Sequence, residues 1–300
     1  MARKIIFLAS AAFALGMSSS AMAAPDDTVI VGILEEHPSD TNAKPVFVRA
    51  VFHKTGAAWA AYDPACAKGA CFPRETNWTV GFDGRAVGQV RAVTPAAWEM
   101  ISDVGRQSLA PGARAPFVGE RSEKFTGWAG GPVHRPLVST SSTHVADPEG
   151  WKAAALPAPL DKAVRDRMRA KFPKAERCAS AEENTPAPWA YQDGDLVVDG
   201  GYASKSGWRI ARVSLKADDY RCDGPLPDTG ESPFSAMSVA ISPAGAMTEL
   251  GFDMQLLDAG DYDANGRSEL VFMFSHYNAD GYKLFANDFS EQASFGFSFH

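Results

Sequence analysis

The fold prediction starts from residues 261–274, Asp-Tyr-Asp-Ala-Asn-Gly-Arg-Ser-Glu-Leu-Val-Phe-Met-Phe. The first nine of these residues carry side-chain oxygen atoms at positions 1, 3, 5 and 9, with a glycine at position 6. The last five form a continuous apolar run, which is typical of a buried strand. An acidic loop that leads directly into a strand is therefore the feature from which we work outward.

The alternating oxygen atoms of this loop suit a hard cation such as Ca²⁺. The side-chain donors are Asp261, Asp263, Asn265 and Glu269. Calcium binds six or more oxygen atoms, and a tightly curled loop can bring alternate side chains to one centre. Gly266 permits the left-handed backbone that such a turn needs. An EF-hand would require a bidentate acid at the twelfth position, which is Phe272 here, and a helix on each side, so the loop is not an EF-hand.

This loop resembles the Asp-x-Asp-x-Asp-Gly-x-x-Asp loop of FG-GAP/VCBS repeats, which occur in integrin-α-type β-propellers and in many bacterial surface and secreted proteins. The similarity runs from Asp258 into the strand that begins at Leu270, and the chain has one clear loop where family members carry several. It implies a calcium unit at residues 256–286, in which the loop joins two strands of a blade. By this resemblance, the ligands of one structural Ca²⁺ are Asp261, Asp263, Asn265, Arg267 (through its carbonyl) and Glu269.

Short strands between turns account for most of the remaining chain. Apolar, β-branched or alternating runs predict strands at 29–34, 45–52, 57–62, 78–93 (a hairpin with Asp83-Gly84 at its turn), 209–215, 237–241, 249–257, 270–276, 282–285 and 295–299. A second hairpin turn is expected at residues 278–281, Asn-Ala-Asp-Gly. The predicted fold class is therefore mainly β, with a β-propeller-like or other antiparallel meander architecture.

One helix is expected near residues 159–173. Apolar residues recur there every four positions, at Leu160, Val164, Met168 and Phe172, and a proline follows the last of them. The flanking stretches are rich in Ala and Pro, which fits either a domain boundary or a surface insertion between sheets. We favour the insertion, and so predict a single β-rich domain over residues 24–300.

Residues 1–23 are typical of a cleavable bacterial secretory signal. Arg3 and Lys4 give a positive start, residues 5–17 are apolar, and Ala21-Met22-Ala23 is a small-x-small cleavage pattern. The apolar run is shorter than the roughly 20 residues of a spanning helix, so we expect no membrane span in the mature chain. The sequence therefore predicts a periplasmic or secreted protein, cleaved near Ala23.

Net charge and cysteine content limit the classes of partner and the roles of the cysteines. The formal net charge is −7, which argues against a nucleic-acid partner because such partners need basic patches. Four cysteines in an exported protein favour disulfides over a zinc site. Of the three possible pairings we favour Cys66–Cys71, which can close a short turn, together with Cys178–Cys222.

No catalytic motif can be recognised. The sequence has neither a His-Glu-x-x-His pair nor a Gly-x-Ser-x-Gly elbow. Residues 139–144 place hydroxyls beside an imidazole, but neighbours in sequence seldom form a triad, and we interpret them as a polar loop. Glu35 and Glu36 are consecutive, so on a strand they would point to opposite faces; we interpret them as a solvated strand end.

Three classes of function stay open. We favour an exported, non-catalytic calcium-binding protein that acts as a binding or envelope-associated module toward an unknown protein or glycan. The alternatives are a periplasmic or secreted hydrolase without a recognisable motif, and a glycan-binding module. A cleft with two carboxylates would favour the hydrolase, whereas exposed Trp or Tyr side chains on a shallow face would favour the glycan binder.

Overall fold

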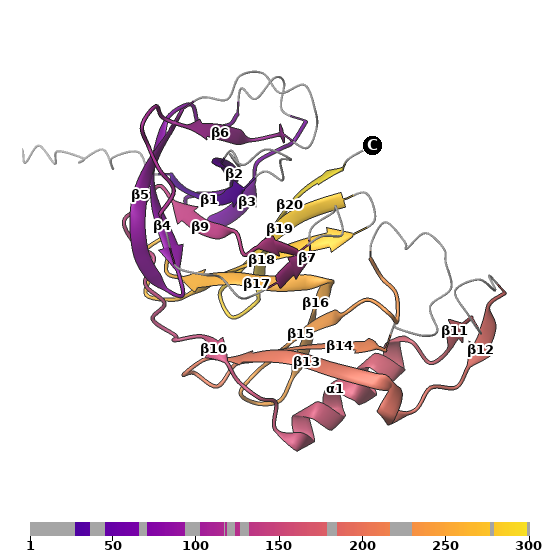
Figure 1. Ribbon diagram of the computed structural model, residues 1–300. Coiled ribbons are helices and arrows are strands. Elements are labelled where there is room, and N and C mark those ends of the chain that lie inside the picture. The colour runs from indigo at the N-terminus through magenta and orange to yellow at the C-terminus, as the bar shows by residue number, and fades with distance from the viewer. Residues whose placement is uncertain are drawn as a thin grey trace, which may run out of the picture.

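The computed structural model describes residues 28–36, 46–65, 71–93, 103–116, 118, 124–126, 132–178, 185–216, 230–276 and 279–298. The predicted signal sequence, residues 1–23, lies outside this part of the chain. Figure 1 shows the described residues stacked as a barrel, a four-stranded sheet, a five-stranded sheet and a helix. The strands of each sheet are antiparallel, as the sequence predicts.

The N-terminal part of the chain forms a closed barrel. Its six strands are β1 (Val29–Glu36), β2 (Val46–Thr55), β4 (Thr76–Phe82), β5 (Arg85–Val93), β6 (Arg106–Leu109) and β9 (Leu137–Thr140). The ring closes because β1 pairs with both β2 and β9. Closure leaves none of the six as an open edge. Trp78 is fully buried inside, and its ring would lie 2.9 Å from a Cβ at Gly32, so only glycine fits there.

A four-stranded meander follows at the C-terminus. It consists of β17 (Met254–Gly260), β18 (Glu269–His276), β19 (Ala279–Ala286) and β20 (Glu291–Ser298). Along β18, Val271 and Met273 pack into the barrel core, whereas Leu270, Phe272 and Phe274 pack on the opposite side. Both faces of the strand are thus buried, which explains its continuous apolar run.

The opposite side of the meander packs on a five-stranded sheet. Its strands are β10 (Lys152–Ala153), β13 (Leu196–Ala203), β14 (Arg209–Leu215), β15 (Met237–Ile241) and β16 (Met247–Phe252). The far face of this sheet is covered by α1 (Ala158–Lys171), which buries Val164 and Met168 (Figure 1). The helix predicted near residues 159–173 is therefore confirmed.

Five shorter strands and the 3₁₀ turn η3 also belong to the described structure. β3 (Ala58–Ala61) extends the barrel sheet from β2, β7 (Lys124–Thr126) pairs with β8 (Pro132–His134), β11 (Ala175–Arg177) pairs with β12 (Ala187–Trp189), and η3 covers Asp193–Asp195.

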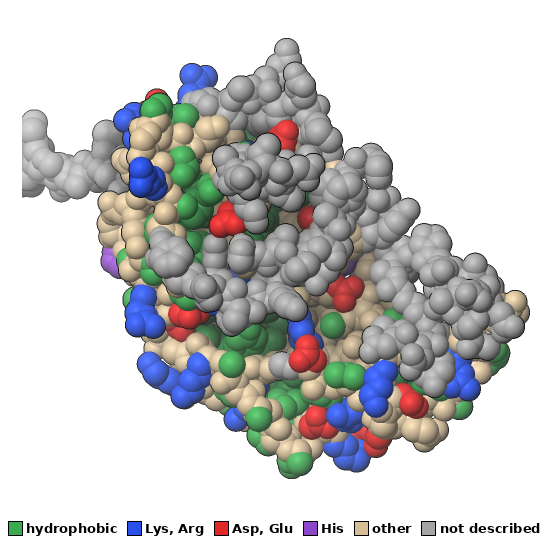
Figure 2. Space-filling view, in the orientation of Figure 1, with side chains coloured by type: hydrophobic (Ala, Val, Ile, Leu, Met, Phe, Trp, Pro, Cys, Tyr) green, Lys and Arg blue, Asp and Glu red, His purple; other side chains and the backbone are tan. Residues whose placement is uncertain are grey.

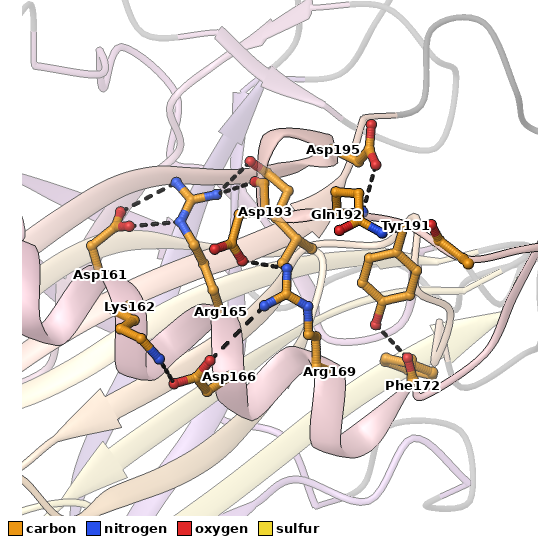
Figure 3. Close-up of polar contacts among 12 residues, drawn as sticks. Asp161, Lys162, Arg165, Asp166, Arg169, Phe172, Tyr191, Gln192, Asp193 and Asp195 are labelled. Carbon is orange, nitrogen blue, oxygen red and sulfur yellow. Dashed lines mark hydrogen bonds and ion pairs between the residues drawn. The ribbon is translucent and has the colours of Figure 1, made fainter.

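Polar contacts connect α1 to the loop that precedes β13 (Figure 3). Arg165 pairs with Asp161, with 2.6 Å between Nε and Oδ1, and donates to the carbonyl oxygens of Asp193 at 2.9 Å and Leu196 at 2.7 Å. Arg169 pairs with the Asp193 carboxylate. The Asp193 carboxylate of the acidic turn at residues 193–195 is thereby paired with a basic side chain of α1.

A buried ion pair in the barrel is also hydrogen-bonded to the meander. Arg49 is fully buried and pairs twice with Glu35, at 2.6 and 3.0 Å, while Tyr282 of β19 donates to the same carboxylate at 2.7 Å. The prediction of a solvated strand end at Glu35 is therefore wrong. The partners that make its burial favourable lie on other strands, where a local pattern cannot reveal them.

Two strand boundaries also differ from the prediction. The strand expected over residues 249–257 is divided at Asp253, whose φ of 47° turns the chain from β16 into β17. The Asp253 carboxylate accepts from the Ala236 N–H at 2.8 Å and so stabilises this bend. The position predicted for the second hairpin turn, residues 278–281, is wrong, because residues 279–281 belong to β19. Residues 277–278 lie outside the described part.

The mainly β architecture with one helix is confirmed for the described residues, while a propeller-like arrangement is not. No cysteine among these residues is free. Cys71 and Cys178 are described, but their predicted partners, Cys66 and Cys222, lie outside the described part, so the pairing stays a prediction.

The surface carries both signs of charge. On the face drawn in Figure 2, acidic and basic side chains are interspersed, most clearly around α1. Within the described part of the chain, no helix has the length and apolar character needed to cross a membrane.

Candidate metal centre

The acidic loop connects two neighbouring strands of the meander. Asp261 follows the last residue of β17, and Glu269 is the first residue of β18. Ala264 and Gly266 have φ values of 61° and 84°, so the backbone turns sharply twice within the loop. The strand–loop–strand arrangement expected from the sequence is present, and it positions the two ends of the loop side by side.

Three of the predicted ligands come together. Carboxylate oxygens of Asp261, Asp263 and Glu269 lie within 4.8 Å of one another. Glu269 is 1% exposed, and the Asp263 side chain is 4% exposed, whereas Asp261 is half-buried. Three carboxylates so close together and so far out of water form a strongly negative centre.

Backbone N–H groups hold the loop in its curled shape. The carboxylate of Asp261 accepts from the N–H groups of Asn265 at 2.8 Å and Gly266 at 2.9 Å. The carboxylate of Asp263 accepts from the same Asn265 N–H at 3.1 Å. The chain is thereby wrapped around the acidic side chains, as a cation-binding loop requires.

The other two predicted ligands are exposed. The Asn265 amide donates to Asp263 at 3.1 Å, and its oxygen accepts from the Arg267 N–H at 2.8 Å, so this side chain borders the centre. The Arg267 guanidinium pairs with Asp288, away from the carboxylates. The prediction for Arg267 concerns its backbone carbonyl, and it stays a prediction.

Lys54 is a residue of the candidate centre that the sequence analysis missed. Its ammonium forms an ion pair with Asp263 from the end of β2, and its side chain is 15% exposed. The two residues are 209 positions apart. No local pattern could have identified this contact, because it exists only once the barrel packs beside the meander.

The protein supplies too little positive charge for this centre. Burial raises the pKa of Glu269 to about 8; repulsion by Asp263 and Asp261 acts in the same direction, and the Tyr262 N–H and Lys54 oppose it. One ammonium faces three carboxylates. The donor set, all oxygen, therefore fits a hard divalent cation, which would replace the proton that Glu269 otherwise favours.

The segment after β9 supports the loop. The Asp261 N–H donates to the Ala146 carbonyl at 2.7 Å, and the Ser142 hydroxyl donates to the Tyr262 carbonyl at 2.9 Å. Ser142 lies in the loop after β9, and its hydroxyl is used structurally. The polar loop predicted over residues 139–144 is found only from residue 141, because Ser139 and Thr140 are buried residues of β9. The Ser268 hydroxyl also donates to Asp147, at 2.6 Å.

In comparisons with known proteins, no family model, no curated protein and no solved structure matched the chain. Functional conclusions therefore depend on the geometry and chemistry of the sites themselves.

Proposed function

We propose that the protein is an exported, non-catalytic calcium-binding protein in which the loop 261–269 holds one structural Ca²⁺. The observation that carries this proposal is the cluster of three carboxylates within 4.8 Å, which among the described residues is faced by a single lysine. A buried centre with this excess of negative charge gains most from a cation that arrives from solution.

The donor chemistry favours a hard cation such as calcium over softer metals such as zinc and copper. The cluster offers carboxylate oxygens without histidine or cysteine, and these suit Ca²⁺, Mg²⁺ or Mn²⁺. The short loop between antiparallel strands supports the resemblance to FG-GAP/VCBS loops. We extend that resemblance to the unit at residues 256–286, and not to a propeller-like arrangement of the whole chain.

The N-terminal sequence supports a location where calcium is abundant. Residues 1–23 have the three parts of a secretory signal, so we place the mature protein in the periplasm or outside the cell. Extracellular calcium sites typically have dissociation constants of about 0.1–1 mM. The role that follows is a binding or envelope-associated module whose fold the ion stabilises.

Thermal unfolding of the mature chain tests the proposal. With a dissociation constant near 0.1 mM, about 1 mM Ca²⁺ would stabilise the fold by about 1.4 kcal/mol. The melting temperature should therefore rise with Ca²⁺ relative to EDTA, and Asp261→Ala or Asp263→Ala should abolish the rise. Asp166→Ala, on the exposed face of α1, is the charge-matched control and should keep it. Identical melting of wild type in Ca²⁺ and EDTA would show that Lys54 alone compensates the loop.

A further inference from the structure

A second polar site lies where the barrel, the meander and the five-stranded sheet meet. The structure has a cavity of about 320 Å³ there, which is within the usual range for small-ligand sites. Its chemically distinctive lining residues are Arg135, Asp147, Trp151, Lys152, Tyr202 and Asp258. None of them belongs to the predicted calcium ligands.

Asp258 is the buried acid of this cavity. Its side chain is 3% exposed, and its Oδ1 accepts from the N–H groups of Gly84 at 3.1 Å and Ala259 at 3.0 Å. Its Oδ2 is buried without a hydrogen-bond partner. The Arg135 guanidinium is 3.9 Å away, and burial still raises the pKa of Asp258 to about 7. This oxygen lies toward Gly81, where a Cβ would be 3.1 Å from it, and a buried oxygen without a partner is costly.

Asp147 forms the opposite side of the same corner. A Cβ at Gly84 would lie 2.6 Å from the Asp147 Cβ, and Gly84 has a φ of 65°. Glycine is therefore required at this turn, where Asp147 and Asp258 both contact Gly84. Asp147 also accepts from the Trp151 N–H at 2.5 Å, which positions the segment that carries Trp151.

The remaining lining is aromatic and apolar. Trp151 and Tyr202 are both partly exposed, and the Trp151 indole is held by Glu149 at 3.0 Å and by the ring of Phe289. A separate hollow of about 560 Å³ also borders Ala153 and Tyr202, and it extends toward α1 at Leu156 and Asp161. A ligand with an apolar face could lie on an aromatic ring in the cavity.

The charges of the cavity exclude strongly charged ligands. An anion would meet the carboxylates of Asp83, Asp147 and Asp258, and a cation would meet Lys152 and Arg135, of which Arg135 pairs with Asp83 at 2.9 Å. A neutral polyhydroxylated molecule has no such conflict, because it can donate to carboxylates, accept from ammonium and guanidinium groups, and present C–H groups to a ring. We propose that this cavity binds one residue of a neutral saccharide, between Trp151 and Asp258. The proposal does not rest on the calcium site.

Binding of defined sugars to the mature chain tests this proposal. The probes are glucose, galactose, mannose, N-acetylglucosamine, maltose and cellobiose, each titrated to about 50 mM, with inorganic phosphate and choline as charged comparators. Protein-observed NMR shifts report affinity, and both Ca²⁺ and EDTA buffers are used. Sugar binding in either buffer supports the proposal for the cavity. The outcome of this test is therefore independent of whether the loop binds calcium.

Variants locate the bound sugar. Trp151→Ala should weaken binding at least about tenfold, since stacked aromatic side chains supply much of the affinity of such sites. Trp208→Ala is the matched control, because Trp208 also packs on Phe289, at 5.2 Å between ring centroids, but does not line the cavity. It should change affinity less than about twofold. Lys152→Ala, an exposed position, should weaken binding without affecting folding.

Three results would overturn the proposal. The first is the absence of shifts with every sugar in both buffers. The second is binding that Trp151→Ala and Lys152→Ala leave unchanged, which would place the sugar elsewhere. The third is tighter binding of phosphate or choline than of any sugar, which would assign the cavity to a charged ligand.

Discussion

Glu35 and Glu269 are both buried carboxylates at the contact between barrel and meander, yet their surroundings differ. Burial alone would raise the pKa of Glu35, but the paired guanidinium of Arg49, with Arg106 and the Tyr282 hydroxyl, holds it below its usual value. Burial raises the pKa of Glu269 to about 8, and repulsion by the two neighbouring carboxylates acts in the same direction.

The difference distinguishes a structural ion pair from the proposed cation site. At Glu35 the chain supplies a positive counter-charge and hydrogen-bond donors, so the carboxylate is ionised and both of its oxygens have partners. At Glu269 the chain gathers acids, and within its described part the basic side chain that pairs with them is Lys54. Buried carboxylates that the protein leaves undercompensated indicate where a cation from solution would be bound.

The largest effect is expected from breaking the compensated pair. Arg49→Met leaves Glu35 buried without its guanidinium, which should lower the free energy of unfolding by about 3–5 kcal/mol. The loss should be the same in Ca²⁺ and in EDTA, because this pair does not involve the loop. Denaturant unfolding measures it.

The exposed pair of Arg91 with Glu75 is the control for that variant. Both side chains are about 60% exposed. Arg91→Met should therefore change stability by less than about 0.5 kcal/mol. Equal losses for Arg49→Met and Arg91→Met would contradict the importance of burial in the comparison.

Asp258 gives an intermediate case, with an arginine near but not in contact. A pKa of about 7 in the folded state means that its contribution to stability is present at low pH and is lost as pH rises through 7. Asp258→Asn removes this dependence. The difference in unfolding free energy between variant and wild type should shift by about 3 kcal/mol between pH 5 and pH 8, in favour of the variant. Measurements in saturating Ca²⁺ keep Glu269 from contributing, and a difference that does not vary with pH would contradict the assignment.

Glu269→Gln tests the undercompensated centre itself. The variant should lose the calcium-dependent gain of about 1.4 kcal/mol. In EDTA above pH 8 it should be more stable than wild type, because a buried charge has been removed. Scanning calorimetry in both buffers compares the two, and a variant that keeps the full calcium shift would exclude Glu269 as a ligand.

The smallest effect is expected at Lys54. Removing its ammonium by Lys54→Met should tighten calcium binding about two- to fivefold, because a largely buried ion pair that competes with the metal is lost. The variant should also be less stable than wild type in EDTA. Calcium titrations of both proteins measure the ratio of affinities, and weaker binding by the variant would mean that Lys54 assists the site.

Local patterns predicted much of this molecule. The apolar run of β18, the hairpin of β4 and β5, and the four-residue spacing of α1 each depend on neighbouring residues, and each was found. The loop ligands Asp261, Asp263 and Glu269 were recognisable because their spacing alone brings them together.

What the sequence did not reveal depends on distant contacts. The barrel closes through β6 and β9, which are only four residues long and give little periodic signal. The burial of Glu35 needs Arg49 and Tyr282, and the cavity beside Asp258 needs three sheets to meet. Such features have no signature in any single stretch of the chain.

Equilibrium dialysis of the mature chain against ⁴⁵Ca²⁺ tests the central claim most directly. We expect about one ion bound per chain, with a dissociation constant of about 0.1–1 mM, and no specific binding by Glu269→Gln or Asp263→Ala. Absence of binding by folded wild-type protein at about 5 mM Ca²⁺, or equal binding by these variants, would contradict it.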